Sequence, residues 1–448
     1  MGRLFGTDGA RGVANSELTP ELAMNIGRAA ACVLTQGTNR PRFLIGKDTR
    51  QSSDMLEAAL AAGLCSVGAD VLLLGVVPTP AVAYLVKHYG YDAGVMISAS
   101  HNPCEFNGIK LFQSTGYKLP DEIENRMEAI ILDSAEVPPV KVGGDVGKIT
   151  YSETAVEDYV EHIKNAAQAD CSGYKVAFDC ANGSASATAE KLFNALGIDA
   201  VYTACQPNGT NINENCGSTH LEALQKTVVE NGCRLGFAFD GDADRMLAVD
   251  ENGDTVDGDK IIAICAQYMK EQGILKNNTA VVTVMSNMGF FKFCKENAIA
   301  CEKTAVGDRY VLENMLANGH NIGGEQSGHV IFLDHASTGD GQLSAVMLLN
   351  VLAHSGKPLS ELAAQMQVYP QVLVNVRVTA QGKAAYAEDA VIHEKIAEAE
   401  QSMGDAGRVL VRLSGTEPLI RVMLEGEDLD QITTIANEIA AVVKERLS

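Results

Sequence analysis

The strongest constraint on the fold is an alternation of strand-like and helix-like segments along the chain. The run Thr19–Glu21 has the residues of a helix start, and apolar residues then recur on one helical face. The segments Phe43–Gly46 and Val71–Gly75 are short apolar runs of strand type. Strands that alternate with helices in this way predict layered α/β units.

The length of the chain predicts several such units. Its 448 residues are too many for one hydrophobic core and suggest about three or four domains. The strand Lys175–Asp179 falls in a second unit, and a third contains the strand Val281–Val284 and a loop at Thr304–Val311. The last unit has strands near Leu373–Val376 and Val409–Val411 and a helix after Asp428. We predict domains at residues 1–150, 151–256, 257–366 and 367–448.

The run Asp240–Arg245 concentrates three carboxylates and one cation in six residues. Alternate aspartates in a turn can direct their oxygens at one centre, and hard divalent cations such as Mg²⁺ and Ca²⁺ prefer oxygen ligands. Three like charges in one loop repel one another unless a cation lies among them. The loop therefore predicts a metal site.

An EF-hand is the main alternative for this loop. Its twelfth residue would be Glu251, as an EF-hand requires, but its sixth is Arg245 where an EF-hand needs glycine. The preceding residues Leu235–Phe239 alternate with the period of a strand, and Met246–Val249 are also apolar. The sequence favours a strand–loop–strand site.

A second polar centre is Ser98–Pro103, which follows the buried-strand run Gly94–Ile97. Ser100 would lie just beyond a strand end, where α/β proteins bind their ligands. His101 is adjacent and could move a proton or bind an anion. The pattern Gly-x-Ser-x-Gly is absent, so a hydrolase nucleophile elbow is not supported. A simple polar turn remains the alternative.

Two further loops carry polar groups. Hydroxyls, a glycine and arginines at Arg412–Pro418, with Arg421, have the composition of a phosphate cradle. The run Gly323–His329 brackets an acid, an amide, a hydroxyl and an imidazole with glycines, which suits a polyol such as a sugar. Surface turns are the alternative for both.

These motifs occur in the order of the α-D-phosphohexomutase superfamily, which the chain resembles from end to end. The resembling segments are Phe5–Gly12, Ser98–Pro103, Asp240–Arg245, Gly324–His329 and Arg412–Pro418. The Glu325–His329 loop, Asn211–Asn213 and Cys216–His220 are most similar to the bacterial members that act on glucosamine phosphates. Ala10 stands where isoleucine is common in the family.

The resemblance implies a fold of four domains around a central cleft: three related α/β units with mixed sheets and a smaller α+β C-terminal domain. Residues 1–150 would carry the phosphoserine loop and 151–256 the metal loop. Residues 257–366 would carry the sugar-binding loop and 367–448 a phosphate-binding loop. The sequence itself displays no repeat among the first three units.

The resemblance also implies the chemistry. Ser100 would carry a phosphate, and Asp240, Asp242 and Asp244 would hold one Mg²⁺ per chain that also touches Ser100. The phosphoryl group would pass to glucosamine 6-phosphate, giving a bisphosphate that turns end for end. Its other phosphate would return to Ser100, and glucosamine 1-phosphate would leave. Arg245 would stabilise the transferred charge, and His101 and Lys110 are both candidates for the general base. The remaining site residues implied are Arg11, Gly307, Asp308, Arg309, Glu325, Ser327 and His329 for the substrate, and Arg412, Ser414, Gly415, Thr416 and Arg421 for its phosphate.

Three other functions compete with this one. An aspartate-nucleophile phosphatase would use Asp240 and Asp242 and would not need Ser100. A non-enzymatic Ca²⁺ module would bind the ion without turnover, and Arg245 opposes it. The runner-up enzyme is a phosphomannomutase/phosphoglucomutase.

Composition limits the partners. The net charge of −22 opposes general binding to nucleic acid or to membrane surfaces. An anionic sugar phosphate therefore needs local cations, which lie in or near the motifs: Arg11, Lys47, Arg50, Lys110, Arg245, Arg309, Arg412 and Arg421. Eleven scattered cysteines without Cys-x-x-Cys, and no signal-like or membrane-length apolar run, predict a reducing cytoplasm. The oligomeric state is open, with a homodimer one option.

Overall fold

The structure is a computed structural model that describes residues 3–6, 8–35, 38–414 and 417–448. The chain divides into two compact units, one formed by Met1–Met285 with Ile299–Gln365 and the other by Ser286–Ala298 with Met366–Ser448. The first unit contains three mixed α/β sheets and the second a small antiparallel sheet. The predicted fold class, three mixed α/β units with an α+β C-terminal unit, is confirmed at this level.

The first sheet has the order β1-β2-β6-β5-β3-β4-β7. Its strands are β1 (Phe5–Gly6), β2 (Gly9–Val13), β3 (Arg42–Lys47), β4 (Asp70–Val76), β5 (Ala93–Ile97), β6 (Phe106–Gln113) and β7 (Ile149–Tyr151). β3 pairs in parallel with β4 and β5, while β6 pairs antiparallel with β5 and β2. The buried run of β5 ends at the residues that precede Ser100.

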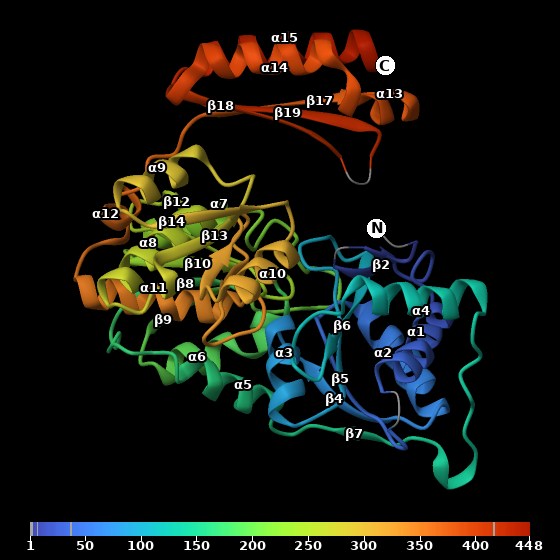
Figure 1. The fold of residues 1–448 in the computed structure, drawn as a ribbon. Helices are drawn as coiled ribbons and strands as arrows, with labels where there is room; N and C mark the ends of the chain where they lie inside the picture. The colour runs from blue at the N-terminus through green and yellow to red at the C-terminus, as the bar shows by residue number, and fades with distance from the viewer. Residues whose placement is uncertain (1–2, 7, 36–37, 415–416) are drawn as a thin grey trace. The chain divides into compact units, whose positions relative to one another are not determined.

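Helices cover both faces of this sheet (Figure 1). One face packs on α1 (Pro20–Leu34), α2 (Gln51–Ser66) and α4 (Asp121–Asp133), and its core includes Phe43 and Val95. The opposite face packs on α3 (Thr79–His88), where Gly46 and Gly94 leave room for Val82. As predicted, α1 begins at Pro20, and the Thr19 hydroxyl accepts a hydrogen bond from the Leu22 amide.

The second sheet has the order β12-β11-β10-β8-β9. Its strands are β8 (Lys175–Asp179), β9 (Asp199–Thr203), β10 (Leu235–Phe239), β11 (Met246–Asp250) and β12 (Thr255–Val256), and the nearby helices are α5 (Ala155–Lys164), α6 (Ala189–Ala195) and α7 (Glu222–Asn231). β10 and β11 pair antiparallel, from Phe239 against Met246 onward, so residues 240–245 form the loop between them. The prediction of a strand–loop–strand site is confirmed.

The third sheet has the order β14-β13-β15-β16. Its strands are β13 (Thr279–Thr283), β14 (Ala300–Thr304), β15 (Ile322–Gly324) and β16 (Val330–Phe332), with helices α8 (Gly258–Glu271), α10 (Asp308–Asn318), α11 (Gly341–Ser355) and α12 (Leu359–Ala363). The loop expected at Thr304–Val311 is too long, because α10 already begins at Asp308 after Gly307, which has φ +132°. The Glu325–His329 loop joins the antiparallel strands β15 and β16.

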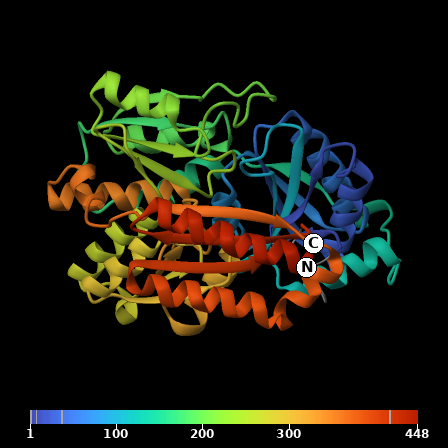
Figure 2. The ribbon, with the colours of Figure 1, turned by 90° about the horizontal axis from the view of Figure 1, so that it is seen from above.

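The C-terminal unit has three antiparallel strands in the order β17-β19-β18. These are β17 (Gln371–Arg377), β18 (Gly407–Leu413) and β19 (Leu419–Gly426), and the helices are α13 (Ala380–Ala385), α14 (Ala390–Met403) and α15 (Leu429–Leu447). α14 and α15 lie side by side along one face of the sheet (Figures 1 and 2). Helix α9 (Met288–Glu296) belongs to this unit, because the buried Glu425 accepts from the Met288 amide at 2.8 Å.

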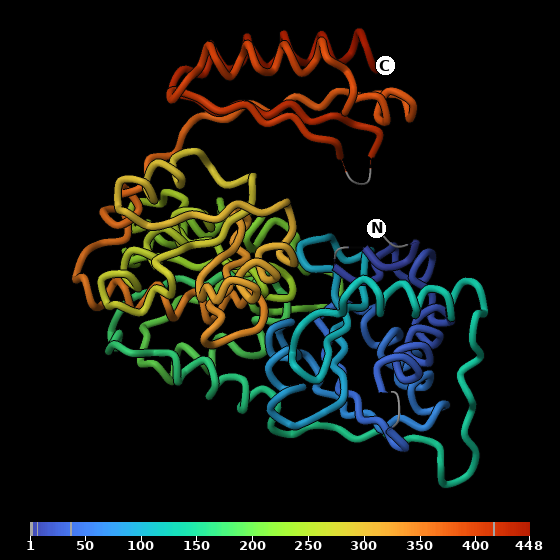
Figure 3. Tube along the Cα trace, in the orientation of Figure 1, coloured from blue at the N-terminus to red at the C-terminus, as the bar shows by residue number. Residues whose placement is uncertain are grey.

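Between α4 and β7 the chain runs as a long extended segment around the first sheet (Figure 3). Short 3-10 turns occur at Gly143–Asp145, Ser184–Ala187, Lys276–Asn278, Tyr386–Glu388 and Gly404–Ala406. Among the described residues, no helix is long and apolar enough to cross a membrane.

Candidate active site

Ser100 lies beyond the end of β5 and is almost completely buried. Its backbone has φ +52°, the left-handed region that costs energy in a residue with a side chain. Its carbonyl accepts hydrogen bonds from Arg50 Nη2 at 3.1 Å and Asn213 Nδ2 at 2.9 Å. Its hydroxyl donates to Asp240 Oδ2 at 2.6 Å. The strained backbone is thus held so that Oγ faces the metal loop.

Arg50 is the buried support of this turn. Its guanidinium pairs with Asp48, and both side chains have no exposed surface. It also donates to the carbonyl of Asn102 and, at 3.3 Å, to Ser98 Oγ. The Ser98 hydroxyl in turn accepts from the Ser100 amide at 3.0 Å. Arg50 therefore fixes the backbone of the serine loop from behind.

The three aspartates of the metal loop are buried and converge. One carboxylate oxygen from each of Asp240, Asp242 and Asp244 lies within 4.8 Å of the other two. Oδ1 of Asp242 and Oδ1 of Asp244 are buried and have no hydrogen-bond partner in the structure. Burial, together with Asp244 and Asp242, holds the pKa of Asp240 well above its ordinary value. Unpaired hard oxygens in one place fit a divalent cation such as Mg²⁺.

The loop backbone makes this convergence possible. Ala243 has φ +55°, and Gly241 lies so close to the serine loop that a Cβ atom would be 2.5 Å from the Ser100 carbonyl oxygen. Asp242 is also tied to α3, because its carbonyl accepts from the Thr79 amide at 2.9 Å and its carboxylate from the Thr79 hydroxyl. The first and second sheets therefore meet at the metal loop.

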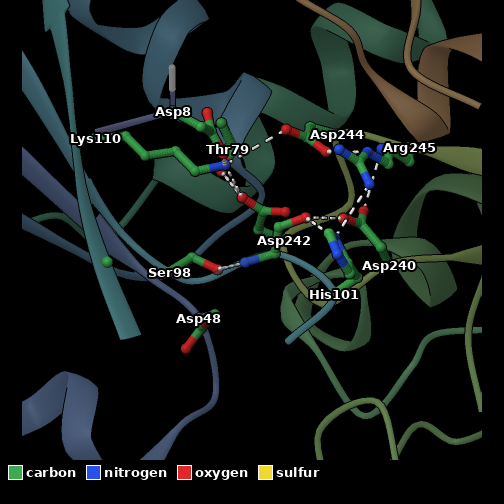
Figure 4. Close-up of polar contacts among 12 residues, drawn as sticks. Asp8, Asp48, Thr79, Ser98, His101, Lys110, Asp240, Asp242, Asp244 and Arg245 are labelled. Carbon is green, nitrogen blue, oxygen red and sulfur yellow. Dashed lines mark hydrogen bonds and ion pairs between the residues drawn. The ribbon is translucent and has the colours of Figure 1, made fainter. Parts of the chain in front are cut away.

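Lys110, on β6, reaches the same carboxylates (Figure 4). Its ammonium is 2.7 Å from Asp242 Oδ2, 2.9 Å from Asp8 Oδ2 and 3.5 Å from Asp244 Oδ2. Burial lowers the pKa of Lys110, but the three carboxylates outweigh it and hold the pKa well above its ordinary value. Lys110 is consequently a cation that donates hydrogen bonds.

His101 and Arg245 lie together on the other side of the aspartates (Figure 4). His101 Nδ1 accepts a hydrogen bond from Arg245 Nη1 at 3.1 Å, and His101 Nδ1 is also 3.3 Å from Ser100 Oγ. Burial, with Arg245 and Arg11 nearby, lowers the pKa of His101 to about 4. His101 is therefore neutral near pH 7, and Nδ1 carries a lone pair.

A second ionic network was missed by the sequence reading. Lys118 donates to Asp8 Oδ1 and to Asp308 Oδ2, both at 2.7 Å. Asp308 is also 3.5 Å from His329 Nε2, and His329 Nδ1 is 3.7 Å from Asp244. The network joins the N-terminal motif, the start of α10 and the metal loop. No motif in the sequence pointed to Lys118, because its partners Asp8 and Asp308 are far away along the chain.

The predicted sugar loop has its residues in different surroundings. Glu325 is half-buried and its Oε1 accepts from the Gly307 amide at 3.1 Å, while Ser327 is exposed. His329 is buried and accepts from the Gly339 amide at Nε2, 3.0 Å away. Gln326 donates to Asp257, the N-cap of α8, at 3.1 Å. Gln326 therefore supports the fold of this loop, while Glu325 and Ser327 have atoms facing outward.

Two predicted substrate arginines already have carboxylate partners. Arg11 pairs with Asp8 at 2.9 Å and donates to Asn102 at 3.3 Å. Arg309 pairs with Glu313 at 2.9 Å and also with Asp121. Arg11 lies next to the serine loop, whereas Arg309 is paired with carboxylates of α4 and α10.

The C-terminal unit carries the predicted phosphate loop. Arg412 on β18 and Arg421 on β19 are directly opposite each other in the antiparallel ladder. Burial and Arg421 lower the pKa of Arg412 from its ordinary value. Ser414 is buried, and Lys383 donates to its carbonyl at 2.6 Å. Gly415 and Thr416 lie outside the described residues. Arg421 also pairs with Glu417 at 3.2 Å, so the predicted phosphate site rests on two adjacent guanidinium groups and one carboxylate.

Comparison with known families explains this set of residues. Models of the four phosphoglucomutase/phosphomannomutase domains match in order: α/β/α domain I at residues 2–137, domain II at 157–253, domain III at 257–369 and the C-terminal domain at 373–442. Phosphoglucosamine mutase of Acetivibrio thermocellus is 58% identical over 448 residues, and that of Caldicellulosiruptor saccharolyticus is 57% identical over 451 residues. Both alignments cover 100% of each chain. The chain belongs to the phosphohexomutase family. Its full-length relatives within that family are phosphoglucosamine mutases.

Solved structures agree on the phosphohexomutase fold. A phosphoglucomutase/phosphomannomutase family protein from Burkholderia thailandensis has a TM-score of 0.84 at 24% identity, covering 99% of this chain and 98% of that one. N-acetylphosphoglucosamine mutase from Aspergillus fumigatus, solved with GlcNAc-6P and magnesium, has a TM-score of 0.71 at 18% identity. It covers 99% of this chain and 96% of that one. At these identities the similarity establishes the shared fold.

Proposed function

We propose that this phosphohexomutase interconverts glucosamine 6-phosphate and glucosamine 1-phosphate through a phosphate on Ser100 and a bisphosphorylated sugar. The observation that carries the proposal is the buried Ser100 hydroxyl, 2.6 Å from Asp240 in a loop of three converging carboxylates. The full-length relatives at 54–58% identity, all phosphoglucosamine mutases by name, support the choice of sugar.

Phosphoryl transfer here exchanges one P–O bond for another. The bond from phosphorus to Ser100 Oγ breaks while a sugar hydroxyl oxygen bonds to phosphorus, and the hydroxyl proton ends on Ser100 Oγ. We assign His101 Nδ1, 3.3 Å from Oγ, as the base that moves this proton; to do so, its lone pair leaves the Arg245 donor from which it accepts in the structure. Lys110 donates hydrogen bonds instead, and Arg245 offsets charge on the transferred group. The reverse transfer from the other end of the bisphosphate restores the phosphoserine.

Asp240, Asp242 and Asp244 would hold one Mg²⁺ per chain. Their buried, unpaired Oδ1 atoms at Asp242 and Asp244 supply ligands of the kind this ion prefers. When bound, the ion offsets the negative charge of the phosphoryl group and polarises its oxygens.

The substrate is held by two sets of groups. Glu325, Ser327 and His329, with Arg11 and the Gly307–Arg309 turn, form the sugar-binding set. Arg412, Ser414 and Arg421, with the Gly415 and Thr416 positions, bind the phosphate that is not being transferred. The amine of glucosamine is protonated over part of the neutral range, and Glu325 can accept a charge-assisted hydrogen bond from it. The cytoplasmic location of the protein and its assembly as a homodimer remain predictions.

The carrier role is tested first. Intact mass and peptide mapping should find phosphate on Ser100 in part of the purified protein. Ser100→Ala should lower turnover by several orders of magnitude, since the covalent route is lost. Ser114→Ala, an exposed serine of the same domain, is the matched control and should be fully active. Near-normal turnover in Ser100→Ala would contradict the carrier role.

Substrate choice is a separate test. A phosphomannomutase/phosphoglucomutase is the second candidate, which the descriptions of the matching domain models and of the Burkholderia thailandensis structure favour. The specificity constant for glucosamine 6-phosphate should exceed those for glucose and mannose 6-phosphates by about ten- to a hundredfold, or about 1–3 kcal/mol. N-acetylglucosamine 6-phosphate should be poor, because acylation removes the charge and adds bulk. A higher constant for either neutral sugar would favour the second candidate.

A further inference from the structure

Two cysteines meet behind the metal loop without any part in the proposed chemistry. Cys180 follows β8 and Cys205 follows the parallel neighbour β9, two residues beyond Thr203. The Cys180 amide and the Cys205 thiol both donate to the Thr203 carbonyl, at 3.2 Å and 3.1 Å. The shared Thr203 carbonyl brings the two cysteines together, and their thiols are near enough to shift each other's pKa. Both cysteines are free thiols in the structure.

The two thiols differ in access and in acidity. Cys180 is completely buried, whereas Cys205 is half-buried and is followed by exposed residues at 206–208. The neighbouring Cys180 thiol lowers the pKa of Cys205, while the same contact and burial hold the pKa of Cys180 well above its ordinary value. An accessible thiol with a lowered pKa beside a buried thiol is the arrangement of an attacking and a resolving cysteine.

We propose that Cys205 is an oxidation site, and that peroxide converts the Cys180 and Cys205 thiols into a disulfide. The Cys205 thiolate attacks hydrogen peroxide, breaking the O–O bond and giving a sulfenic acid and hydroxide. The Cys180 sulfur then attacks the Cys205 sulfur, and its thiol proton leaves with the sulfenic hydroxyl as water. Two thiols lose two electrons in total, and one peroxide becomes two waters.

This bond would disturb the site because the Cys180 loop supports Ser100. The Ala181 carbonyl accepts from the Asn213 amide at 2.9 Å, and Asn213 Nδ2 holds the Ser100 carbonyl. The Asn182 carbonyl accepts from the Thr49 hydroxyl at 2.6 Å, beside Arg50.

The metal loop also contacts the segment that follows Cys180. The Gly241 carbonyl accepts from the Ser184 amide at 2.8 Å, and a Cβ at Gly183 would lie 2.3 Å from that oxygen. A disulfide requires sulfur atoms about 2.0 Å apart, much closer than two unbonded thiols. Drawing the two sulfurs together therefore shifts a close-packed segment that contacts both Ser100 and the metal loop.

Disulfide mapping tests the pairing without any assay of turnover. The full-length protein is treated with hydrogen peroxide, blocked with N-ethylmaleimide and digested without reduction. Cleavage after Lys175 and Lys191 isolates Cys180, and cleavage after Glu214 separates Cys205 from Cys216. A linked pair of Cys180 and Cys205 fragments that dithiothreitol releases is expected. A Cys180–Cys216 link, or no link at all, would overturn the proposal.

Activity measurements test the coupling. Peroxide should lower turnover of the wild-type protein by roughly tenfold or more, with recovery after dithiothreitol. Cys205→Ser should keep basal turnover and resist peroxide, and Cys205→Ala should behave in the same way. Cys301→Ser removes another half-buried thiol, on β14, and should stay as sensitive as the wild type. Equal inactivation of Cys205→Ser and the wild type would contradict the proposal. A mapped Cys180–Cys205 disulfide with unchanged turnover would contradict its coupling to the active site.

Discussion

At the scale of single residues, the serine turn depends on a cation that takes no part in the chemistry. Arg50 is completely buried, pairs with Asp48 and holds the carbonyls of Ser100 and Asn102. Ser100 needs such support because its left-handed backbone, at φ +52°, is unfavourable by itself. The orientation of Ser100 is thus set by a neighbouring ion pair.

Arg50→Met should strongly destabilise the first sheet. The substitution leaves the buried Asp48 carboxylate and two carbonyls without their donor, which costs about 3–5 kcal/mol. Arg40→Met is the matched control, because the Arg40–Asp70 pair lies at the surface and such pairs contribute little to stability. Amide hydrogen exchange in β3 and β5 measures both effects locally. Equal protection in the two variants would contradict the role of Arg50.

Single residues also mark the limit of what the sequence predicts. Asp240, Asp242 and Asp244 stand in one compact motif, so their convergence could be anticipated, whereas the meeting of Ser100 with Asp240, 140 residues away, was implied only by the family resemblance. Thr79 and Lys118 could not be anticipated, because Thr79 is 163 residues from Asp242 and Lys118 is 190 residues from Asp308. Contacts of this kind arise from how sheets pack, and no local pattern encodes them.

At the scale of elements, periodicity located the strands well and the helix starts less well. β8 and β10 have the predicted bounds, because both are short apolar segments and Leu235–Phe239 has the period of a strand. The start of α10 at Asp308 was missed, because its first residues are polar and Gly307 reads as loop. The grouping of α9 with the C-terminal sheet was also not foreseen, since it depends on Glu425 and Met288.

The C-terminal ladder contains a charge conflict that a phosphate would relieve. Arg412 and Arg421 are cross-strand partners, and like charges in that position repel. Arg421→Ala should raise the Michaelis constant for the sugar phosphate and leave phosphorylation of Ser100 unchanged. Inorganic phosphate should protect the β18 and β19 amides from exchange in the wild type and not in the variant.

Arg377→Ala is the control for that experiment. Arg377 is an exposed arginine of β17 in the same sheet. It should leave both the Michaelis constant and the phosphate effect unchanged. An unaltered Michaelis constant in Arg421→Ala would remove the loop from the substrate site.

Two helix caps should respond to pH in opposite directions. Asp340 caps α11, and burial raises its pKa to about 7. Asp389 caps α14, and Arg446 lowers its pKa. The folded protein therefore holds a proton on Asp340 from about pH 4 to 7, and its stability falls as pH rises through that window. The stabilisation from Asp389 is present above its unfolded pKa and is lost as pH falls through the folded pKa.

Substitution by asparagine separates these two effects. Asp340→Asn keeps an acceptor for Tyr159 and the Leu343 amide, so α11 should become more protected at pH 8, by about 1–3 kcal/mol, with no gain near pH 4. Asp389→Asn should make α14 less protected at pH 8. Hydrogen exchange of each helix between pH 5 and 8 measures the two trends. A loss of α11 protection in Asp340→Asn at pH 8 would contradict the assigned charge cost.

At the scale of the whole molecule, a chain with a net charge of −22 concentrates further negative charge where two sheets meet. The serine turn leaves the first sheet and the aspartates leave the second, and Lys110 of the first sheet and Thr79 at the start of α3 hold Asp242. Length predicted about three or four domains, and the family resemblance implied four of them in this order. The ionic contacts between the sheets could not be predicted, since they need the packed structure.

Because Mg²⁺ would bind ligands from both sheets, its effect on stability should depend on the state of Ser100. A ligand that binds the folded state stabilises it by RT ln(1 + [L]/Kd), and the unfolded chain does not bring the three aspartates together. A phosphate on Ser100 adds nearly two negative charges beside Asp240, so it raises the affinity for the cation. Mg²⁺ should therefore raise the unfolding temperature of the phosphorylated protein by several degrees more than that of the dephosphorylated protein. Na⁺ at matched ionic strength is the control for screening, and Asp242→Asn should reduce the Mg²⁺ effect in both forms. An equal rise in unfolding temperature with Mg²⁺ in the phosphorylated and dephosphorylated proteins would contradict a site shared by the metal and the phosphoserine.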